Sequence, residues 1–230
     1  MIWFTPYDIW LIPAIILTLV AQGMVSSAYK KYGQIQNQKG ITGAMVARNI
    51  LDRNGLNNVK IERISGNLTD HYDPRSNVIR LSDGVHDSSS IAAVGIAAHE
   101  VGHAIQHESG YAPIKLRNAI LPGVLISSRL AMPIILVGLL FGGNYYLAMT
   151  GIFLYCAVVV FQIVTLPVEF NASRRAIETV YESAYLTPEE TDGAKKVLRA
   201  AALTYLAAAF AAIMQLLRLL SIVNGGRRRR

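Results

Sequence analysis

The sequence predicts a multi-pass α-helical membrane protein that carries a small α+β domain, and three observations lead to this fold class. Of the 230 residues, 52% are hydrophobic and only 16% are charged, and the mean hydropathy is +0.34. That composition is too apolar for an ordinary soluble domain of this size. Four apolar stretches are each long enough to cross ~30 Å of hydrocarbon. Between them lie polar segments, one of which contains strand-like alternation.

The first apolar stretch predicts an N-terminal transmembrane anchor within residues 1–29. Its aromatic residues fit an interfacial belt: Trp3, Tyr7 and Trp10. A cleaved signal peptide is the alternative, because residues 25–28 are rich in small side chains. The leader contains Asp8 and no Lys or Arg, and the apolar run is longer than a typical signal-peptide core. We therefore favour an uncleaved anchor.

Residues 30–118 are polar enough to form the α+β domain. Its predicted elements are, in chain order, a helix over 42–54, strands over 59–64 and 78–81 with a turn at 73–77 between them, and a helix over 89–108. Thr42 caps the first helix and Gly55 ends it. The strand at 77–82 is a candidate edge strand to which an extended peptide could add. An ordinary hairpin packed on the last helix is the alternative.

Residues 119–167 predict a transmembrane hairpin, with spans over 119–141 and 145–167 joined by a Gly-Gly-Asn linker. Arg129 falls inside the first span. Because a charged side chain is costly there, it should face protein, snorkel to the interface or mark a later helix start.

Residues 168–199 are polar again and predict a helical segment. Thr187 is the expected cap of a helix that has Pro188 at its first position. Residues 200–230 predict a C-terminal transmembrane helix followed by an Arg-rich tail.

The segment that follows residue 98 is His-Glu-Val-Gly-His, which matches the helical pattern H-E-x-x-H. On an α-helix the side chains of residues i and i+4 share one face, so His99 and His103 can direct their rings at one metal ion. Glu100 can then take a proton from a water that the metal activates. Gly102 is small enough to let another part of the chain approach closely. The alternative is a partly exposed helix whose His and Glu side chains only make hydrogen bonds.

A catalytic zinc site needs a third protein ligand. A metzincin would place a His six residues after His103, but position 109 is Ser, so that class is excluded. A gluzincin would use a Glu on a later helix. The carboxylates considered for this role are Glu108, Glu169, Glu178, Glu182, Glu189 and Glu190. Glu169 is favoured because it directly follows a long apolar run and opens a helix-compatible stretch.

The predicted topology agrees with this choice. The two histidines precede the transmembrane hairpin and Glu169 follows it. A hairpin of two spans returns the chain to the side of the membrane that it left. The three ligands therefore share one face, as one zinc ion requires.

Three segments carry a family resemblance: A-A-H-E-V-G-H-A-I-Q-H at 97–107, L-P-V-E-F-N-A-S-R-R-A at 166–176, and the stretch 70–82. They resemble the YugP-type neutral zinc metallopeptidases of bacterial membranes, over nearly the whole chain. More distantly the chain is similar to the HtpX and CAAX prenyl protease group, whose third zinc ligand lies in E-x-x-A-D. Here Glu169 is present, but Ser173 stands in place of the Asp that supports a ligating His in that group.

The distribution of basic residues predicts the orientation. Segments 30–118 and 168–199 contain eleven and five Lys or Arg residues, so the positive-inside rule places both, and the active site, on the cytoplasmic face. The four arginines at 227–230 conflict with four spans, since they would then be outside. Three alternatives would resolve the conflict: the last helix lies at the membrane interface, it re-enters the membrane without crossing it, or the arginines are a residual tag. The net charge of +7 indicates contact with anionic lipid, and no nucleic-acid motif accompanies it.

Four residues are weaker candidates for supporting or substrate-binding roles: His71, His107, Ser173 and Arg174. Together these observations predict a gluzincin-like metallopeptidase domain with one catalytic Zn²⁺, acting in the cell membrane on protein or peptide substrates. Contacts with the lipid bilayer and with other membrane proteins are expected, and nucleic acid is not. A zinc hydrolase of a lipid-linked amide and a non-catalytic metal-binding membrane adaptor remain the alternatives.

Overall fold

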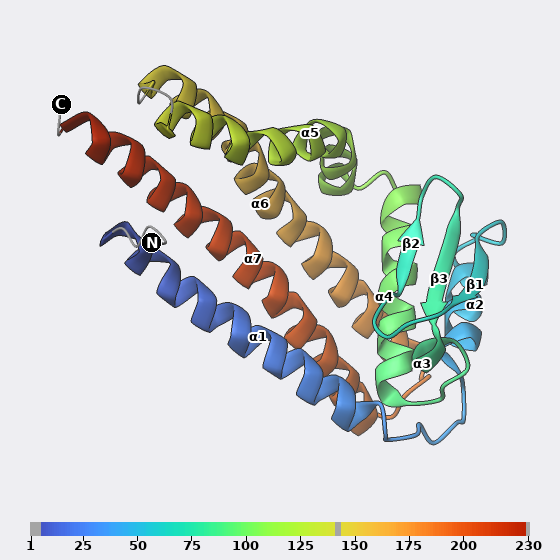
Figure 1. Cartoon of the computed structure of the whole chain (residues 1–230). Helices are drawn as coiled ribbons and strands as arrows, with labels where there is room; N and C mark the ends of the chain where they lie inside the picture. The colour runs from blue at the N-terminus through green and yellow to red at the C-terminus, as the bar shows by residue number, and fades with distance from the viewer. Residues whose placement is uncertain (1–5, 141–143, 229–230) are drawn as a thin grey trace. The chain divides into compact units, whose positions relative to one another are not determined.

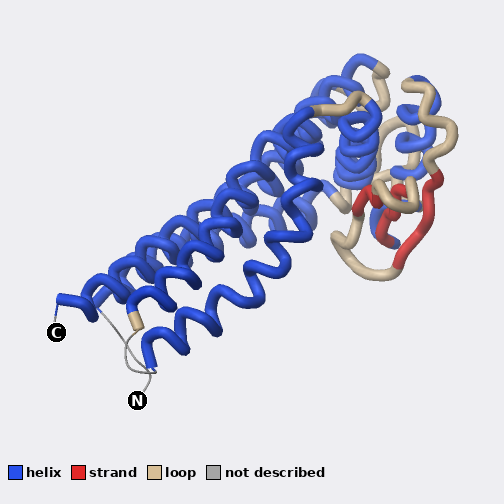
Figure 2. The backbone as a smooth tube through the Cα atoms, turned by 90° about the horizontal axis from the view of Figure 1, so that it is seen from above, coloured by secondary structure: helices blue, strands red, loops and turns tan. Residues whose placement is uncertain are grey.

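The computed structural model describes residues 6–140 and 144–228, with side chains described as far as residue 225. Trp3, the first two residues of the Gly-Gly-Asn linker and the side chains of the four terminal arginines lie outside the described residues. Most of the described chain is helical, and strands contribute one small sheet (Figures 1 and 2). In chain order the elements are η1 (Pro6–Trp10), α1 (Leu11–Tyr32), α2 (Gly43–Arg53), β1 (Lys60–Ile64), β2 (His71–Asp73), β3 (Val78–Ser82), α3 (Asp83–His86), α4 (Ile91–Glu108), α5 (Ala112–Leu140), α6 (Tyr145–Glu182) and α7 (Pro188–Arg228).

The chain divides into two compact units. The helical unit comprises Met1–Ala21, Leu116–Leu166 and Thr204–Arg230, and the α+β unit comprises Gln22–Lys115 and Pro167–Leu203. Within the described residues, four helical stretches are long and apolar enough to cross a membrane: Pro6–Tyr32, Ala112–Leu140, Tyr145–Glu182 and Pro188–Gly225. The four expected spans therefore each correspond to a helix of sufficient length and hydropathy.

Helices α5 and α6 approach each other closely in the helical unit because small residues stand at their contact. A Cβ atom on Gly138 would lie 2.5 Å from the backbone nitrogen of Ala148, and one on Gly151 would lie 2.8 Å from the carbonyl oxygen of Ala131. Small residues allow such approaches between helices in apolar surroundings. The two predicted hairpin helices thus pack directly on each other.

Two arginines of the helical unit differ in their surroundings. Arg129 is exposed on α5, and that helix already begins at Ala112, so neither burial against protein nor a later helix start accounts for it. Of the three expectations for Arg129, only snorkelling of its side chain to the membrane interface remains. Arg218 of α7, for which no partner was predicted from the sequence, donates through Nε to the carboxylate of Asp8 in η1. Both partners are largely buried and both belong to candidate spans.

The sheet of the α+β unit has the order β1-β3-β2. Strand β3 pairs in parallel with β1 and antiparallel with β2. The alternation in the sequence predicted β1 and β3 but not β2. The prediction that 77–82 is an edge strand is wrong because β3 is central. The hairpin joins β2 to β3 instead, through a turn in which Asp73 accepts a hydrogen bond from the N–H of Arg75 at 2.9 Å and Asn77 adopts a φ of 55°.

The predicted helix ends of the α+β unit are confirmed. The Thr42 hydroxyl accepts a hydrogen bond from the N–H of Met45 at 3.3 Å at the start of α2, and Gly55 beyond its end has a φ of 72°. At the start of α7, the Thr187 hydroxyl accepts from the N–H of Glu190, whose carboxylate accepts from the N–H of Thr187 at 2.9 Å. This reciprocal arrangement is a capping box, with Pro188 at the first helical position.

Helix α4 runs through the centre of the α+β unit. Its buried face contributes to one hydrophobic core with α2, β3 and the segments of α6 and α7 that belong to this unit. The Ser90 hydroxyl begins the helix by accepting the N–H of Ala93 at 3.1 Å. Burial of α4 holds its backbone rigidly, which fixes where the side chains of the H-E-x-x-H segment point.

Candidate metal centre

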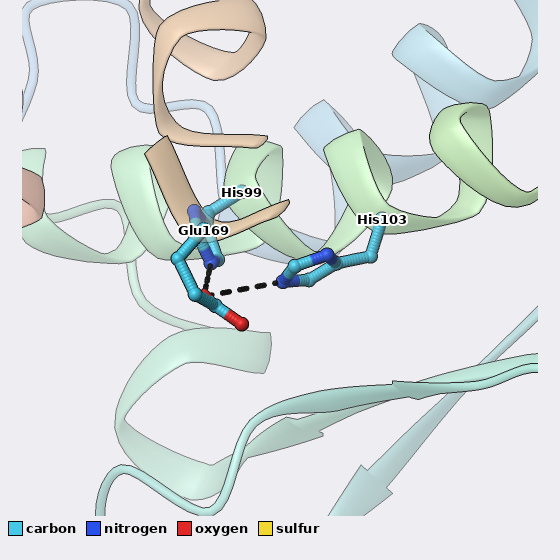
Figure 3. Close-up of side chains that lie close together, drawn as sticks. All are labelled: His99, His103 and Glu169. Carbon is cyan, nitrogen blue, oxygen red and sulfur yellow. Dashed lines mark ion pairs between the residues drawn. The ribbon is translucent and has the colours of Figure 1, made fainter. Parts of the chain in front are cut away.

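The two histidines of α4 and one glutamate of α6 converge on one point (Figure 3). The Oε2 atom of Glu169 lies 3.4 Å from Nε2 of His99 and 3.6 Å from Nε2 of His103. The side chains are 13%, 13% and 5% exposed for His99, His103 and Glu169 respectively. The structure therefore brings together the three residues that the sequence predicted as metal ligands, and it does so in a nearly buried place.

The donor atoms suit a zinc ion in kind and in spacing. Imidazole nitrogen and carboxylate oxygen bind zinc at about 2.0–2.2 Å, so two ligand atoms at the corners of a tetrahedral site lie roughly 3.4 Å apart. The distances from Glu169 to the two rings fall close to that value. Among the described residues, this is the one group of three or more His, Cys, Asp or Glu side chains with ligand atoms within 4.8 Å of one another. The residues present fit the zinc site of the prediction.

The other nitrogen of each ring has a polar neighbour. Ser173 Oγ lies 3.2 Å from Nδ1 of His99, and Gln106 Oε1 lies 3.1 Å from Nδ1 of His103. These contacts orient the rings so that both Nε2 atoms face Glu169. Ser173, which stands in place of the Asp of the resembling group, thus lies beside a predicted ligand. Gln106 is a second such neighbour and was not predicted from the sequence.

A glycine permits the helices that carry the ligands to meet. A Cβ atom at position 102 of α4 would lie 2.9 Å from the carbonyl oxygen and 3.3 Å from the Cα of Ala172 in α6. The backbone of α6 therefore touches α4 between the two histidines, three residues from Glu169. The close approach expected at Gly102 is confirmed, and it brings Glu169 within reach of both rings.

The expected base, Glu100, is held by strand β2. Its side chain is buried with 7% exposure, and its Oε2 accepts a hydrogen bond of 3.0 Å from the backbone N–H of Tyr72. One carboxylate oxygen is thereby fixed by the sheet, and the other can accept a proton. Sequence could not have shown this contact, because 28 residues separate the partners and β2 was not predicted.

The structure does not bring the remaining weak candidates into the cluster of ligand atoms. His71 is exposed and its Nδ1 lies 2.8 Å from the carbonyl oxygen of Thr69. His107 is exposed, with its ring centroid 6.0 Å from that of Tyr72. Arg174 is also exposed, and it forms an ion pair of 2.9 Å with Glu178 one turn further along α6.

The ring of His103 is affected by the carboxylates around it. Burial disfavours the charged ring, but the nearby carboxylates of Glu169 and Glu100 outweigh burial, so the pKa of His103 is raised above its ordinary value. The carboxylates around His103 therefore favour a positive charge at this place.

A nearly buried His-His-Glu cluster on two helices, with a further carboxylate beside the first His, is a donor set that could hold a metal ion. The chain belongs to the family described as "Putative neutral zinc metallopeptidase", whose model matches residues 7–224. It is 45% identical over 216 residues to the "Putative membrane protease YugP" of Bacillus subtilis (strain 168). The aligned region covers 94% of this chain and 96% of that protein. Among solved structures, none matches the chain. The resemblance drawn from the three sequence segments is confirmed.

Proposed function

We propose that this protein is a zinc-dependent endopeptidase of the cell membrane that hydrolyses peptide bonds of membrane or membrane-proximal proteins. The observation that carries the proposal is the spacing of the Glu169 carboxylate from the two rings of α4, which fits one zinc ion. The family description and the name of the relative support it. Because the carboxylate ligand comes from a later helix, the site is of the gluzincin kind.

Each residue has a defined task in this proposal. His99, His103 and Glu169 would hold the zinc, which when bound would supply Lewis acidity for a peptide carbonyl and for a water. Glu100 takes the proton from the attacking water and passes it to the leaving amine. The N–H of Tyr72 keeps the carboxylate of Glu100 in place while it does so.

The sheet edge beside the site suggests how a peptide is held. Strand β2 is an edge strand, and Tyr72 within it already contacts Glu100 of α4. We propose that an extended substrate lies along β2 rather than along the central β3, so that backbone pairing presents its scissile bond next to Glu100.

The proposed location follows from the helices and the charges. The four candidate spans support a multi-pass protein in contact with the lipid bilayer. The excess of Lys and Arg in segments 30–118 and 168–199 supports an active site on the cytoplasmic face. Other membrane proteins are the expected partners, as substrates or as neighbours.

Two alternative functions use the same residues. A zinc hydrolase of a lipid-linked amide would need the same ligands and base, so only turnover of defined substrates distinguishes it. A metal-binding adaptor without catalysis was suggested by Ser173 standing in place of an Asp. The contact of Ser173 with His99 and the fixed position of Glu100 favour a catalytic site over an adaptor.

The proposal is tested by measuring zinc content and casein-type proteolysis of the detergent-purified protein. We expect about one zinc per chain and cleavage for the wild type. Glu100→Gln should keep zinc and lose cleavage, and Glu169→Ala should lose zinc. Glu178→Ala is the matched control on α6, because its carboxylate is exposed and pairs with Arg174. Zinc retention by Glu169→Ala would place the third ligand elsewhere, and a zinc-loaded wild type that hydrolyses only lipid-linked amides would favour that alternative.

A further inference from the structure

We propose that Gln106 is a positioning residue that holds two zinc ligands at once, His103 through its ring and Glu169 through the backbone immediately before it. This inference rests on the proposed function. It concerns a side chain that lies in the same helix as the H-E-x-x-H segment, three residues beyond its last His.

Gln106 is the most enclosed polar side chain near the site. It has 0% exposure and makes three hydrogen bonds. Its Nε2 donates to the carbonyl oxygen of Val168 at 2.8 Å and to Oδ1 of Asn171 at 3.0 Å, while its Oε1 lies 3.1 Å from Nδ1 of His103. A buried amide of this kind is costly unless its bonds are made, so the side chain is confined to this one arrangement.

The arrangement determines which nitrogen of His103 carries the proton. Arg175 can only donate, and its Nε donates to Oδ1 of Asn171 at 2.8 Å, which fixes the orientation of that amide. Oδ1 of Asn171 must then accept from the NH₂ group of Gln106. The Oε1 of Gln106 is consequently left to face His103, where it accepts the Nδ1–H. The lone pair of His103 therefore lies on Nε2, the atom that faces Glu169 (Figure 3).

The bond to Val168 acts on the other ligand. Val168 precedes Glu169 and is fully buried. Pro167, one residue earlier, has no N–H, so the helical hydrogen bond to the carbonyl of residue 163 cannot form there. Gln106 thus binds the backbone of α6 next to Pro167, where the helix lacks one backbone hydrogen bond. Loss of the hydrogen bond to Val168 would leave the helical turn that carries Glu169 less firmly held.

His99 provides an internal comparison. Its Nδ1 faces the hydroxyl of Ser173, which can donate or accept, so this contact does not select a tautomer. Ser173 also makes its contact with one ligand only. We therefore expect the removal of Gln106 to weaken zinc binding more than the removal of the Ser173 hydroxyl.

The experiment measures the zinc dissociation constant of the full-length protein by competition with a chelator. Gln106→Met keeps the length of the side chain and removes all three bonds. Gln106→Glu keeps an acceptor for His103, but the ionised carboxylate cannot donate to Val168. Asn37→Ala is the matched control: Asn37 is a buried amide in the same unit that bonds to the backbone of residues 41 and 89 and touches no ligand. The visible spectrum of the Co²⁺-loaded protein and thermal unfolding of the metal-free protein are recorded for each variant.

We expect Gln106→Met to bind zinc about 10- to 100-fold more weakly than the wild type, with an altered Co²⁺ spectrum. The zinc affinity of Gln106→Glu should lie between those of the wild type and Gln106→Met. Ser173→Ala should lose less zinc affinity than Gln106→Met. Asn37→Ala should lower the unfolding temperature without changing the zinc dissociation constant or the Co²⁺ spectrum. If Gln106→Met does not fold, Gln106→Glu gives the answer alone.

Wild-type affinity and spectrum in a folded Gln106→Met, or full recovery of affinity by Gln106→Glu, would overturn the double role. An equal loss of zinc in Asn37→Ala would show that general destabilisation is responsible. His103→Ala, measured in parallel, tests the metal centre itself. If that variant binds zinc as the wild type does, the proposed metal centre is wrong, whereas failure of the Gln106 variants alone leaves it intact.

Discussion

Replacing Tyr72 by Pro removes the backbone N–H that faces the proposed base, together with the phenol side chain. The N–H of Tyr72 donates to Oε2 of Glu100 at 3.0 Å, and one N–H cannot at the same time serve the ladder to β3. Proline is accepted in edge strands where the N–H points away from the sheet, and the preceding residue, His71, is already extended as proline requires. We therefore expect Tyr72→Pro to fold, to keep zinc and to hydrolyse peptides more slowly.

The magnitude follows from the kind of bond that is lost. A hydrogen bond to a charged group contributes about 1.5–3 kcal/mol, and each 1.4 kcal/mol of transition-state stabilisation is about tenfold in rate. If the bond acts wholly on the orientation of Glu100, kcat/KM falls about 10- to 150-fold.

The control separates the backbone from the ring. Tyr72→Ala loses the phenol, which donates to Asn77 at 2.9 Å, and the ring that faces His107, but it keeps the N–H. The assay compares kcat/KM on an unfolded protein substrate with zinc content for both variants. Equal rates in Tyr72→Pro and Tyr72→Ala, with zinc retained in both, would refute the assigned role of this N–H.

Three further outcomes are expected. Gly102→Ala should lower both the unfolding temperature and the zinc affinity, because the new Cβ meets the backbone of Ala172 at 2.9 Å. This clash opposes the ordinary preference of a helix for alanine over glycine, which is up to about 1 kcal/mol. A rise in both the unfolding temperature and the zinc affinity would contradict the close packing of α4 on α6. Burial disfavours the charged ring of His103, but the nearby carboxylates of Glu169 and Glu100 outweigh burial and raise the pKa of His103 above 6.5. The protonated ring should therefore stabilise the metal-free protein below about pH 6.5, a contribution lost as the pH rises through the raised pKa, while zinc binding should weaken as the pH falls through it. Unfolding and zinc titrations between about pH 5.5 and 8.5 check both signs. Arg174→Ala should change kcat/KM by no more than about twofold, since its exposed ion pair lies outside the ligand cluster.

Local chemistry accounts for what the sequence predicted well. Thr42 and Thr187 could be assigned as helix caps because the bonds that they make lie within three residues. The spacing of His99 and His103 places both on one helical face whatever the tertiary structure is. Glu169 was favoured because it directly follows a long apolar run and opens a helix-compatible stretch, and the two predicted spans, which return the chain to one side, agreed with that choice.

The features that were missed depend on partners far apart in the sequence. Strand β2 has three residues and lies beside a turn, so alternation could not reveal it, and the central place of β3 follows only from its pairing with both neighbours. The spacing of Gln106 from His103 could have drawn attention to it, because residues i and i+3 are neighbours on a helix. Its bond to Val168 spans 62 residues and needed the packed structure.

The ion pair between Asp8 and Arg218 has a consequence for how the protein is made. The partners are separated by 210 residues and belong to the first and last candidate spans. At a synthesis rate of about 5–20 residues per second, roughly 10 to 40 s pass between their translation. During that interval Asp8 cannot form its ion pair with Arg218, because α7 has not yet been synthesised. Synthesis of the first candidate span and completion of its charge pairing are therefore separate events, and a chain interrupted before α7 would stop between them.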